Sequence, residues 1–108
     1  MRKGQVLFKG ELAGMLIQFD DGSFEFKYED RWFKDPMKPA VSLTLPKTTQ
    51  SYHSPFLFPF FYHMLPEGSN KQAVCFHRKI DKDDDFGLLL ATSKTDSIGA
   101  VSVIKSSE

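Results

Sequence analysis

Asp81, Asp83 and Asp85 are the residues whose types and spacing first suggest chemistry, because they alternate like the first ligands of an EF-hand calcium loop. The sixth position of such a loop needs Gly for a sharp turn, and the twelfth needs Glu as a bidentate ligand. Here those positions hold Phe86 and Thr92. We therefore interpret the acidic run as a solvated loop whose last residue, Asp85, caps a following helix, since acids are favoured at helix N-termini.

Cys75 and the histidines are the other side chains that could hold a metal or act as a nucleophile. Cys75 and His77 are two residues apart in a segment predicted to be helical, so their side chains point to different faces. His53 and His63 add none of the C-x2-C or H-x3-H spacings of zinc sites. We therefore expect no metal site and no Cys–His catalytic pair, and we interpret Cys75 as a small core residue.

The chain also lacks the motif sets of phosphoryl transfer, such as a Gly-rich phosphate loop or a catalytic H-R-D tripeptide. Residues 85–87 spell D-F-G, a kinase tripeptide that binds magnesium, but they stand alone. Matches of three residues are common by chance, and a junction between a loop and a helix explains this one. The sequence therefore predicts no catalytic residue and no cofactor, and we do not expect an enzyme.

The composition describes one small domain spanning residues 1–108, with 41% hydrophobic, 14% aromatic and 26% charged residues. Fourteen basic and fourteen acidic side chains cancel, which argues against a nucleic-acid binder of the usual basic kind. A single cysteine, no apolar leader and no long apolar run indicate a reducing compartment without a membrane span. We therefore expect a cytoplasmic protein.

The first half of the chain reads as an antiparallel sheet of about four strands. The alternation of apolar and polar residues predicts these strands at 6–8, 12–19, 23–28 and 41–45. Turns are expected at residues 9–10 and 20–22, because Gly and Asp tolerate a positive φ. In the third strand Phe24, Phe26 and Tyr28 share the face toward the core. Trp32 is expected at the core edge.

The second half reads as short helices followed by a strand. The predicted segments are a helical turn at 29–33, helices near Pro59, at 69–80 and at 86–91, a loop at 47–55, a closing strand at 98–104 and a four-residue tail. For the helix at 69–80, Ser69 is the expected N-cap and Ala73, Phe76 and Ile80 form its apolar face. The predicted fold class is α+β, with an N-terminal antiparallel sheet, two or three short helices and a C-terminal strand.

Aromatic residues crowd one short segment in the middle of the chain. They are Phe56, Phe58, Phe60, Phe61 and Tyr62. We expect at least three of them to pack under the sheet. The others are then free for contact with a partner, since exposed aromatic residues favour interfaces.

Several segments occur in an order that resembles a known family. They read VLFKGELAGMLIQFDDGSFEFKY, VSLTLP, PFFYHMLPEG, DDFGLLLAT and IGAVSVI, between Val6 and Ile104. Together they resemble N-terminal subdomain 1 of HipA-type serine/threonine kinases. The short chain is most similar to the free-standing HipS-like proteins of tripartite HipBST toxin–antitoxin systems. In HipA-type kinases the residues that bind ATP and transfer phosphate lie outside this subdomain, so the resemblance brings no catalytic residue to this chain.

The resemblance implies a function through a partner. The expected partner is a HipT-type serine/threonine kinase, which this chain would bind and neutralise. A HipB-like DNA-binding protein is expected as a further member of the complex. The turn and the helix start after the aromatic run are the implied kinase contact: Leu65, Pro66, Glu67, Gly68, Ser69, Asn70 and Lys71. Pro66 fixes the backbone and Gly68 permits close approach. Ser69 and Asn70 stand where related domains often carry a bulky apolar residue, which argues against a large side-chain plug.

Other interpretations fit the same residues. The chain could activate or help to fold a split HipA-type kinase, or it could be an excised HipA fragment without a role of its own. The turn at residues 65–68 could serve only to start a helix. A small enzyme that uses Cys75 or a histidine would require that Cys75→Ala abolish an activity.

Overall fold

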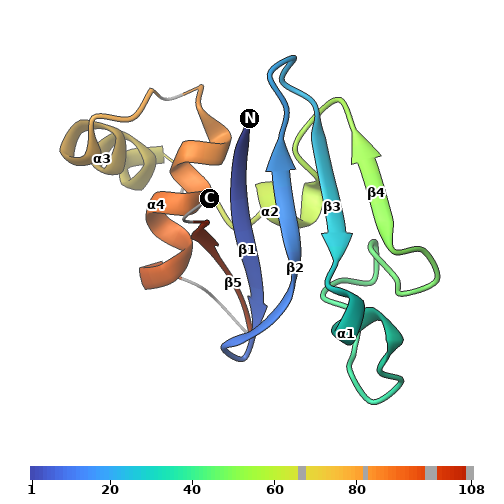
Figure 1. Cartoon of the computed structure of the whole chain (residues 1–108). Helices are drawn as coiled ribbons and strands as arrows, with labels where there is room; N and C mark the ends of the chain where they lie inside the picture. The colour runs from blue at the N-terminus through green and yellow to red at the C-terminus, as the bar shows by residue number, and fades with distance from the viewer. Residues whose placement is uncertain (66–67, 82, 97–99, 107–108) are drawn as a thin grey trace.

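One antiparallel sheet organises the computed structural model, which describes residues 1–65, 68–81, 83–96 and 100–106 (Figure 1). Its strands are β1 (Arg2–Phe8), β2 (Glu11–Gln18), β3 (Phe24–Tyr28), β4 (Ser51–Ser54) and β5 (Val101–Lys105). They lie in the order β4-β3-β2-β1-β5, and every neighbouring pair is antiparallel. The last strand thus pairs with the first, as the lower part of Figure 1 shows.

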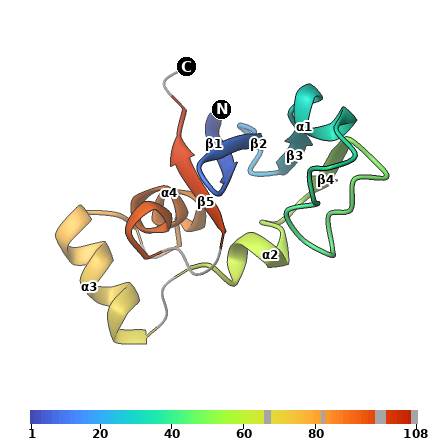
Figure 2. The same ribbon diagram turned by 90° about the horizontal axis from the view of Figure 1, so that it is seen from below.

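The described helices are short. They are α1 (Asp30–Lys34), α2 (Pro59–Tyr62), α3 (Gly68–Arg78) and α4 (Asp85–Asp96). Figure 2 shows α2, α3 and α4 on the same side of the sheet, whereas α1 lies at the end of β3. The predicted α+β fold class is confirmed. None of these helices, in the part of the chain that the structure describes, has the length and apolar character that crossing a lipid bilayer requires.

The turns between the first three strands are those that the sequence predicts. Lys9 and Gly10 have φ values of 52° and 83°, and Gly22 has a φ of 89°. The Phe19 N–H donates to the Ser23 carbonyl at 2.9 Å, which closes the second hairpin. Gly adopts a positive φ without a steric penalty, so Gly10 and Gly22 mark the two turns in the sequence.

The core lies between one face of the sheet and the helices. Phe24, Phe26 and Tyr28 of β3 are buried, as their alternation predicts. The core also contains Phe61 of α2 and Phe86 of α4. Phe26 lies between an edge contact with Tyr28 at 4.8 Å and a tilted contact with Phe61 at 5.7 Å, measured between ring centroids. Aromatic stacking therefore connects the sheet to the helix that precedes the predicted contact segment.

The close approach of α4 to the sheet depends on Gly4 in β1. A Cβ atom added at Gly4 would lie 3.0 Å from Leu90 Cδ2 and 3.0 Å from Val103 Cγ1. These distances are shorter than ordinary carbon contacts. A side chain at this position would require Leu90 and Val103 to shift, so Gly4 favours the close packing of α4 against β1 and β5.

Trp32 of α1 belongs to the core edge, as predicted. Its side chain is buried, its indole N–H donates to the Pro39 carbonyl at 2.8 Å, and its ring lies 5.6 Å from the ring of Phe8. The ammonium of Lys38 lies 5.2 Å from the centre of the same indole and pairs with Glu11 at 2.6 Å. These contacts attach the long loop after α1 to the ends of β1 and β2.

The predicted strand at 41–45 is wrong, because these residues form a turn around the Tyr28 hydroxyl. That hydroxyl accepts a hydrogen bond from the Val41 N–H at 3.1 Å and donates one to the Leu45 carbonyl. Val41 and Leu45 are buried, but Leu43 is 98% exposed. The alternation V-S-L-T-L resembles a half-buried strand, yet its middle apolar residue points into solvent.

The fourth strand lies instead at 51–54, in a segment predicted to be a loop. Its residues are Ser-Tyr-His-Ser, and it pairs with β3 at the edge of the sheet. An edge strand receives part of its stability from backbone pairing, so it needs no apolar pattern of its own. The Gln50 side chain donates to the Tyr28 carbonyl at 3.0 Å, and the Tyr28 N–H donates to the Gln50 carbonyl at 2.9 Å, which extends this pairing.

The C-terminal strand is confirmed in part. It runs from Val101 to Lys105, whereas Ile98 and Gly99 of the predicted strand lie outside the described residues. Ser106 is buried, and its N–H donates to the Lys3 carbonyl at 3.1 Å. Lys105 therefore belongs to β5 and Ser106 is bonded to β1, so neither residue is part of a tail as predicted.

Candidate partner-binding site

The helix α2 fixes the start of the predicted contact segment. Pro59 stands at its first position, where a missing N–H costs nothing. Phe61 is fully buried, and its ring lies 5.1 Å from Phe60 and 6.4 Å from Phe58. The Leu65 N–H donates to the Tyr62 carbonyl at 3.1 Å, so the chain keeps turning after α2. The backbone leading into the contact segment is thus held by the core.

The aromatic segment divides as expected. Phe58 and Phe61 are buried, and Phe60 is packed against the core. Phe56 is 76% exposed and Tyr62 is 52% exposed. The prediction that at least three of the five pack under the sheet is confirmed, and the two others present aromatic surface to solvent.

The structure places only some of the predicted contact residues. Leu65 is half-buried against the core, and Lys71 is half-buried in α3. Gly68, Ser69 and Asn70 form the first turn of α3, so Ser69 lies inside the helix and not before it as a cap. Pro66 and Glu67 lie outside the described residues. The segment therefore runs from the core-anchored end of α2 into the start of α3.

The predicted apolar face of α3 is wrong. Phe76 is 80% exposed, Ala73 is also exposed, and only Ile80 is half-buried. The helix packs against α4, and it ends at Arg78. Lys79 then takes a φ of 55°, and the Ile80 N–H donates back to the Cys75 carbonyl at 3.0 Å, in the pattern of a Schellman motif. Ile80 thus lies beyond the helix, which breaks the seven-residue spacing.

The outer side of α3 is consequently an exposed surface with one large aromatic ring. Phe76 makes an edge contact with His77 at 5.6 Å between ring centroids. Lys71, His77 and Arg78 lie on the same helix, and its sequence contains no acidic residue. Cys75 is half-buried here and is not the core residue that we predicted. An exposed aromatic ring on a helix without acidic residues is compatible with an interface anchor.

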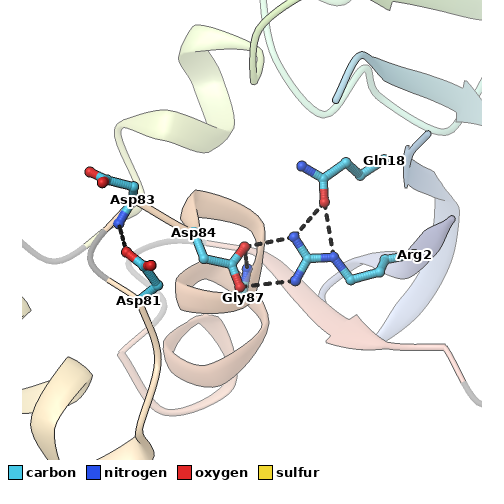
Figure 3. Close-up of polar contacts among 6 residues, drawn as sticks. All are labelled: Arg2, Gln18, Asp81, Asp83, Asp84 and Gly87. Carbon is cyan, nitrogen blue, oxygen red and sulfur yellow. Dashed lines mark hydrogen bonds and ion pairs between the residues drawn. The ribbon is translucent and has the colours of Figure 1, made fainter. Parts of the chain in front are cut away.

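The helix α4 starts at a cluster of polar side chains that connects it to β1 (Figure 3). The Arg2 guanidinium donates to the Asp84 carboxylate at 3.0 Å from Nη1 and at 2.6 Å from Nη2. Arg2 Nε also donates to Gln18 Oε1 at 2.9 Å. The same guanidinium lies 5.2 Å from the centre of the Phe86 ring. Residues from β1, β2 and α4 thus meet at this corner of the molecule.

Asp84 is the N-cap of α4, and the prediction that Asp85 caps this helix is wrong. The Gly87 N–H donates to Asp84 Oδ1 at 3.1 Å, and Asp85 is the first residue of the helix. Hydrogen bonding from Arg2 is the main reason that the pKa of the Asp84 carboxyl lies below its ordinary value. The D-F-G tripeptide therefore belongs to a helix start. Only the spacing of Asp84 to Gly87 could have indicated this cap, and nothing in the sequence pointed to Arg2.

The described residues do not assemble a metal-binding cluster. Within them, no group of three His, Cys, Asp or Glu side chains is close enough to hold an ion. His53 pairs with Glu25 across β4 and β3 at 3.2 Å. Cys75 and His77 lie on α3, away from that pair. What the geometry offers is surface for contact: the α2–α3 segment and the exposed side of α3.

A family model and a solved structure point to the same family. The family model of the HipA N-terminal domain matches residues 4–104. A solved structure titled "N-terminal domain of HipA toxin" superposes with a TM-score of 0.74 and 30% sequence identity, covering 100% of this chain and 95% of that one. The superposition covers nearly all of both chains, so the whole fold of this chain, and not a part of it, is similar to that domain.

Two relatives differ in length. An uncharacterised protein of Haemophilus influenzae is 34% identical over 103 residues, which are 95% of this chain and 92% of that protein. A Sinorhizobium fredii protein named "Putative kinase Y4mE" is 29% identical over 84 residues, and this chain spans only 20% of its length. The matched domain is a non-catalytic subdomain of HipA. On these matches, the chain belongs to the HipA N-terminal domain family.

Proposed function

We propose that this chain is a non-catalytic antitoxin or regulatory subunit that binds and neutralises a HipT-type serine/threonine kinase. A HipB-like DNA-binding protein is the expected third member of the complex, and the cytoplasm is the expected compartment. The kinase would supply the chemistry, and this chain would supply a folded surface that restrains it.

The observation that carries this proposal is the pair of relatives of different length. In Y4mE the matching region is about a fifth of a longer chain whose name describes a kinase. In the Haemophilus protein the matching region is 92% of the whole. A domain that exists both inside a kinase-like chain and nearly alone supports binding in trans, because the surface that meets the kinase body in one case is available for the same contact in the other.

The surface that we assign to the kinase runs from Leu65 through the first turns of α3 and includes Phe76. Leu65 is anchored on the core, so the segment after it starts from a rigid position. Phe76 exposes 80% of its surface and would bury a large apolar area in a complex. Lys71 and Arg78 on the same helix favour an acidic rim on the kinase.

Co-purification with a separately encoded HipT-type kinase, combined with a phosphate-transfer assay, tests the proposal. We expect a stable complex and loss of kinase activity as this chain is added. Phe76→Glu should weaken binding at least tenfold, as expected for a hot-spot aromatic. Leu43→Glu is the matched control, because Leu43 is 98% exposed and lies in the loop after α1. A kinase that neither binds nor loses activity would disprove the proposal.

One observation favours a second function, in which the chain completes a split kinase. In Y4mE the corresponding region is covalently joined to the rest of a longer protein, and a domain joined in this way can stabilise the fold of its neighbour. In that case the kinase should gain solubility or activity when this chain is added. The same titration therefore separates the two functions by the sign of the change in phosphate transfer.

A further inference from the structure

One face of the sheet is left uncovered by the helices. The residues of β3 that alternate with the buried aromatics, Glu25 and Lys27, point away from α2 and α4. Figure 1 looks onto this uncovered face, with α2 behind the strands, and Figure 2 shows α2, α3 and α4 together on the other side. Paired residues on neighbouring strands lie on the same face, so the strand register identifies the residues of β1 and β2 on the uncovered face.

Strand register arranges the uncovered face in two rows across the sheet. In the first row Lys3 of β1, Ile17 of β2 and Glu25 of β3 are neighbours. The second row, one step along the strands, contains these residues in order: Ile104, Gln5, Met15 and Lys27. Ile17 and Met15 are half-buried at the centre of β2, the middle strand. The face thus has an apolar centre with charged residues on its two sides.

The two charged residues of the first row, Lys3 and Glu25, are opposite in sign and lie on either side of Ile17. Lys3 lies one strand to one side of Ile17, and Glu25 lies one strand to the other side. Neighbouring strands are about 4.8 Å apart, so both charges are about that far from the line of β2. Among the described residues Lys3 has no ion pair, and Glu25 pairs only with His53.

This pattern is self-complementary under a two-fold rotation. Consider two copies packed face to face, with the rotation axis between the sheets and parallel to β2. The rotation exchanges the two sides of β2, so Lys3 of one copy faces Glu25 of the other, twice. Ile17 then faces Ile17, and Met15 faces Met15. Packed sheets keep their strand directions within about 30°, so residues next to the axis stay opposite their symmetry mates.

We propose that the uncovered face of the sheet binds a second copy of this chain in an isologous dimer. Ile17 and Met15 form the centre of the interface, and two Lys3–Glu25 pairs fix its register. In the second row Gln5 faces Lys27 of the other copy, so no like charges lie directly opposite each other. The proposal is independent of the kinase-binding function, because α2 and α3 lie on the opposite side of the sheet.

The area of the uncovered face limits the affinity that we expect for the dimer. Five strands about 4.8 Å apart give a face roughly 20 Å wide. Two such faces would bury on the order of 1,000 Å² in total, which is at the lower limit for specific interfaces. We therefore expect a reversible dimer that dissociates on dilution to about 1 μM and forms at about 100 μM.

Charge reversal combined with mixing tests the dimer. Lys3→Glu places glutamate opposite Glu25, and Glu25→Lys places lysine opposite Lys3, so each variant alone should dimerise at least tenfold more weakly. When the two variants are mixed, both pairs are complementary again and a heterodimer should form. The measurement is sedimentation equilibrium of the full chain between about 1 and about 500 μM.

Matched controls exclude a general effect of charge. Lys34→Glu and Asp83→Lys make the same charge changes on exposed residues of α1 and of the loop before α4. These controls should dimerise like the unmodified chain. A chain that stays monomeric at about 500 μM, or variants that do not associate when mixed, would overturn the proposal. Loss of kinase binding in both variants, with a monomeric parent, would assign this face to the kinase and overturn it equally.

Discussion

The Arg2 guanidinium holds the Asp84 carboxylate in two hydrogen bonds of 3.0 and 2.6 Å, although the two residues are 82 positions apart. This pair joins the first strand of the sheet to the first turn of α4. It also orients the carboxylate that caps the helix through the Gly87 N–H. The same two residues therefore stabilise a helix start and a tertiary contact.

Asp84→Ala removes the cap and the ion pair together. We expect the free energy of unfolding to fall by about 1–2 kcal/mol, mainly from the lost N-cap, because a partly exposed ion pair adds little. Urea unfolding followed by circular dichroism measures this change. Asp83→Ala is the matched control, since Asp83 is exposed and one residue away, and it should change stability by less than about 0.5 kcal/mol. Equal effects of the two variants would contradict the role of Asp84.

Asp84 should also make stability depend on pH in the acid range. Its pKa is lowered in the folded protein, so the ionised carboxylate stabilises the fold above its unfolded-state pKa of about 3.9. That contribution is lost as the pH falls through the lower, folded-state pKa. Asp84→Asn retains a capping oxygen without the charge.

The free energies of unfolding of the unmodified protein and of Asp84→Asn should therefore converge as the pH falls below about 4. Urea unfolding at several pH values between about 2.5 and 7 measures this convergence. A difference that stays constant over this range would show that the charge of Asp84 does not contribute.

Gly87→Ala should destabilise the protein even though Gly87 lies in a helix. A Cβ atom at this position would be 2.3 Å from Asp84 Oδ2, which Arg2 holds in place. The resulting displacement of the cap should cost about 1–3 kcal/mol, more than the gain of about 1 kcal/mol in helix propensity. In an Asp84→Ala background the obstacle is gone, so the same substitution should become stabilising. Thermal unfolding of the unmodified protein, the two single variants and the double variant measures this change of sign, and its absence would contradict the mechanism.

Tyr28→Phe should loosen the turn at residues 41–45. The hydroxyl bonds to the Val41 N–H and to the Leu45 carbonyl, and its loss leaves both buried groups without that partner. We expect a loss of about 1–3 kcal/mol in the free energy of unfolding and faster hydrogen exchange at the Val41 amide. Tyr62→Phe is the control, because Tyr62 is 52% exposed. Unchanged exchange at Val41 would argue against the hydroxyl as the centre of this turn.

The second and third strands and both turns of the meander could be predicted from the sequence, because local rules determine them. The first strand was predicted only at 6–8, whereas β1 begins at Arg2, because its first residues lack an apolar alternation and are held by pairing with β2 and β5. Alternating Phe24, Phe26 and Tyr28 define a buried face over two-residue steps, and Gly10 and Gly22 supply the positive φ values. The start of α2 at Pro59 follows from the same kind of local rule. The order of five sequence segments between Val6 and Ile104 was also sufficient to predict the family.

Other features depend on contacts between segments far apart in the sequence, and only the tertiary structure determined them. The turn at 41–45 depends on the hydroxyl of Tyr28, and the edge strand at 51–54 depends on the backbone of β3. The N-cap of α4 is held by Arg2 from the other end of the chain. Phe76 has the helical spacing of a core residue but is exposed on α3. Periodicity along a chain predicts which residues share a face, and only packing decides whether that face is covered.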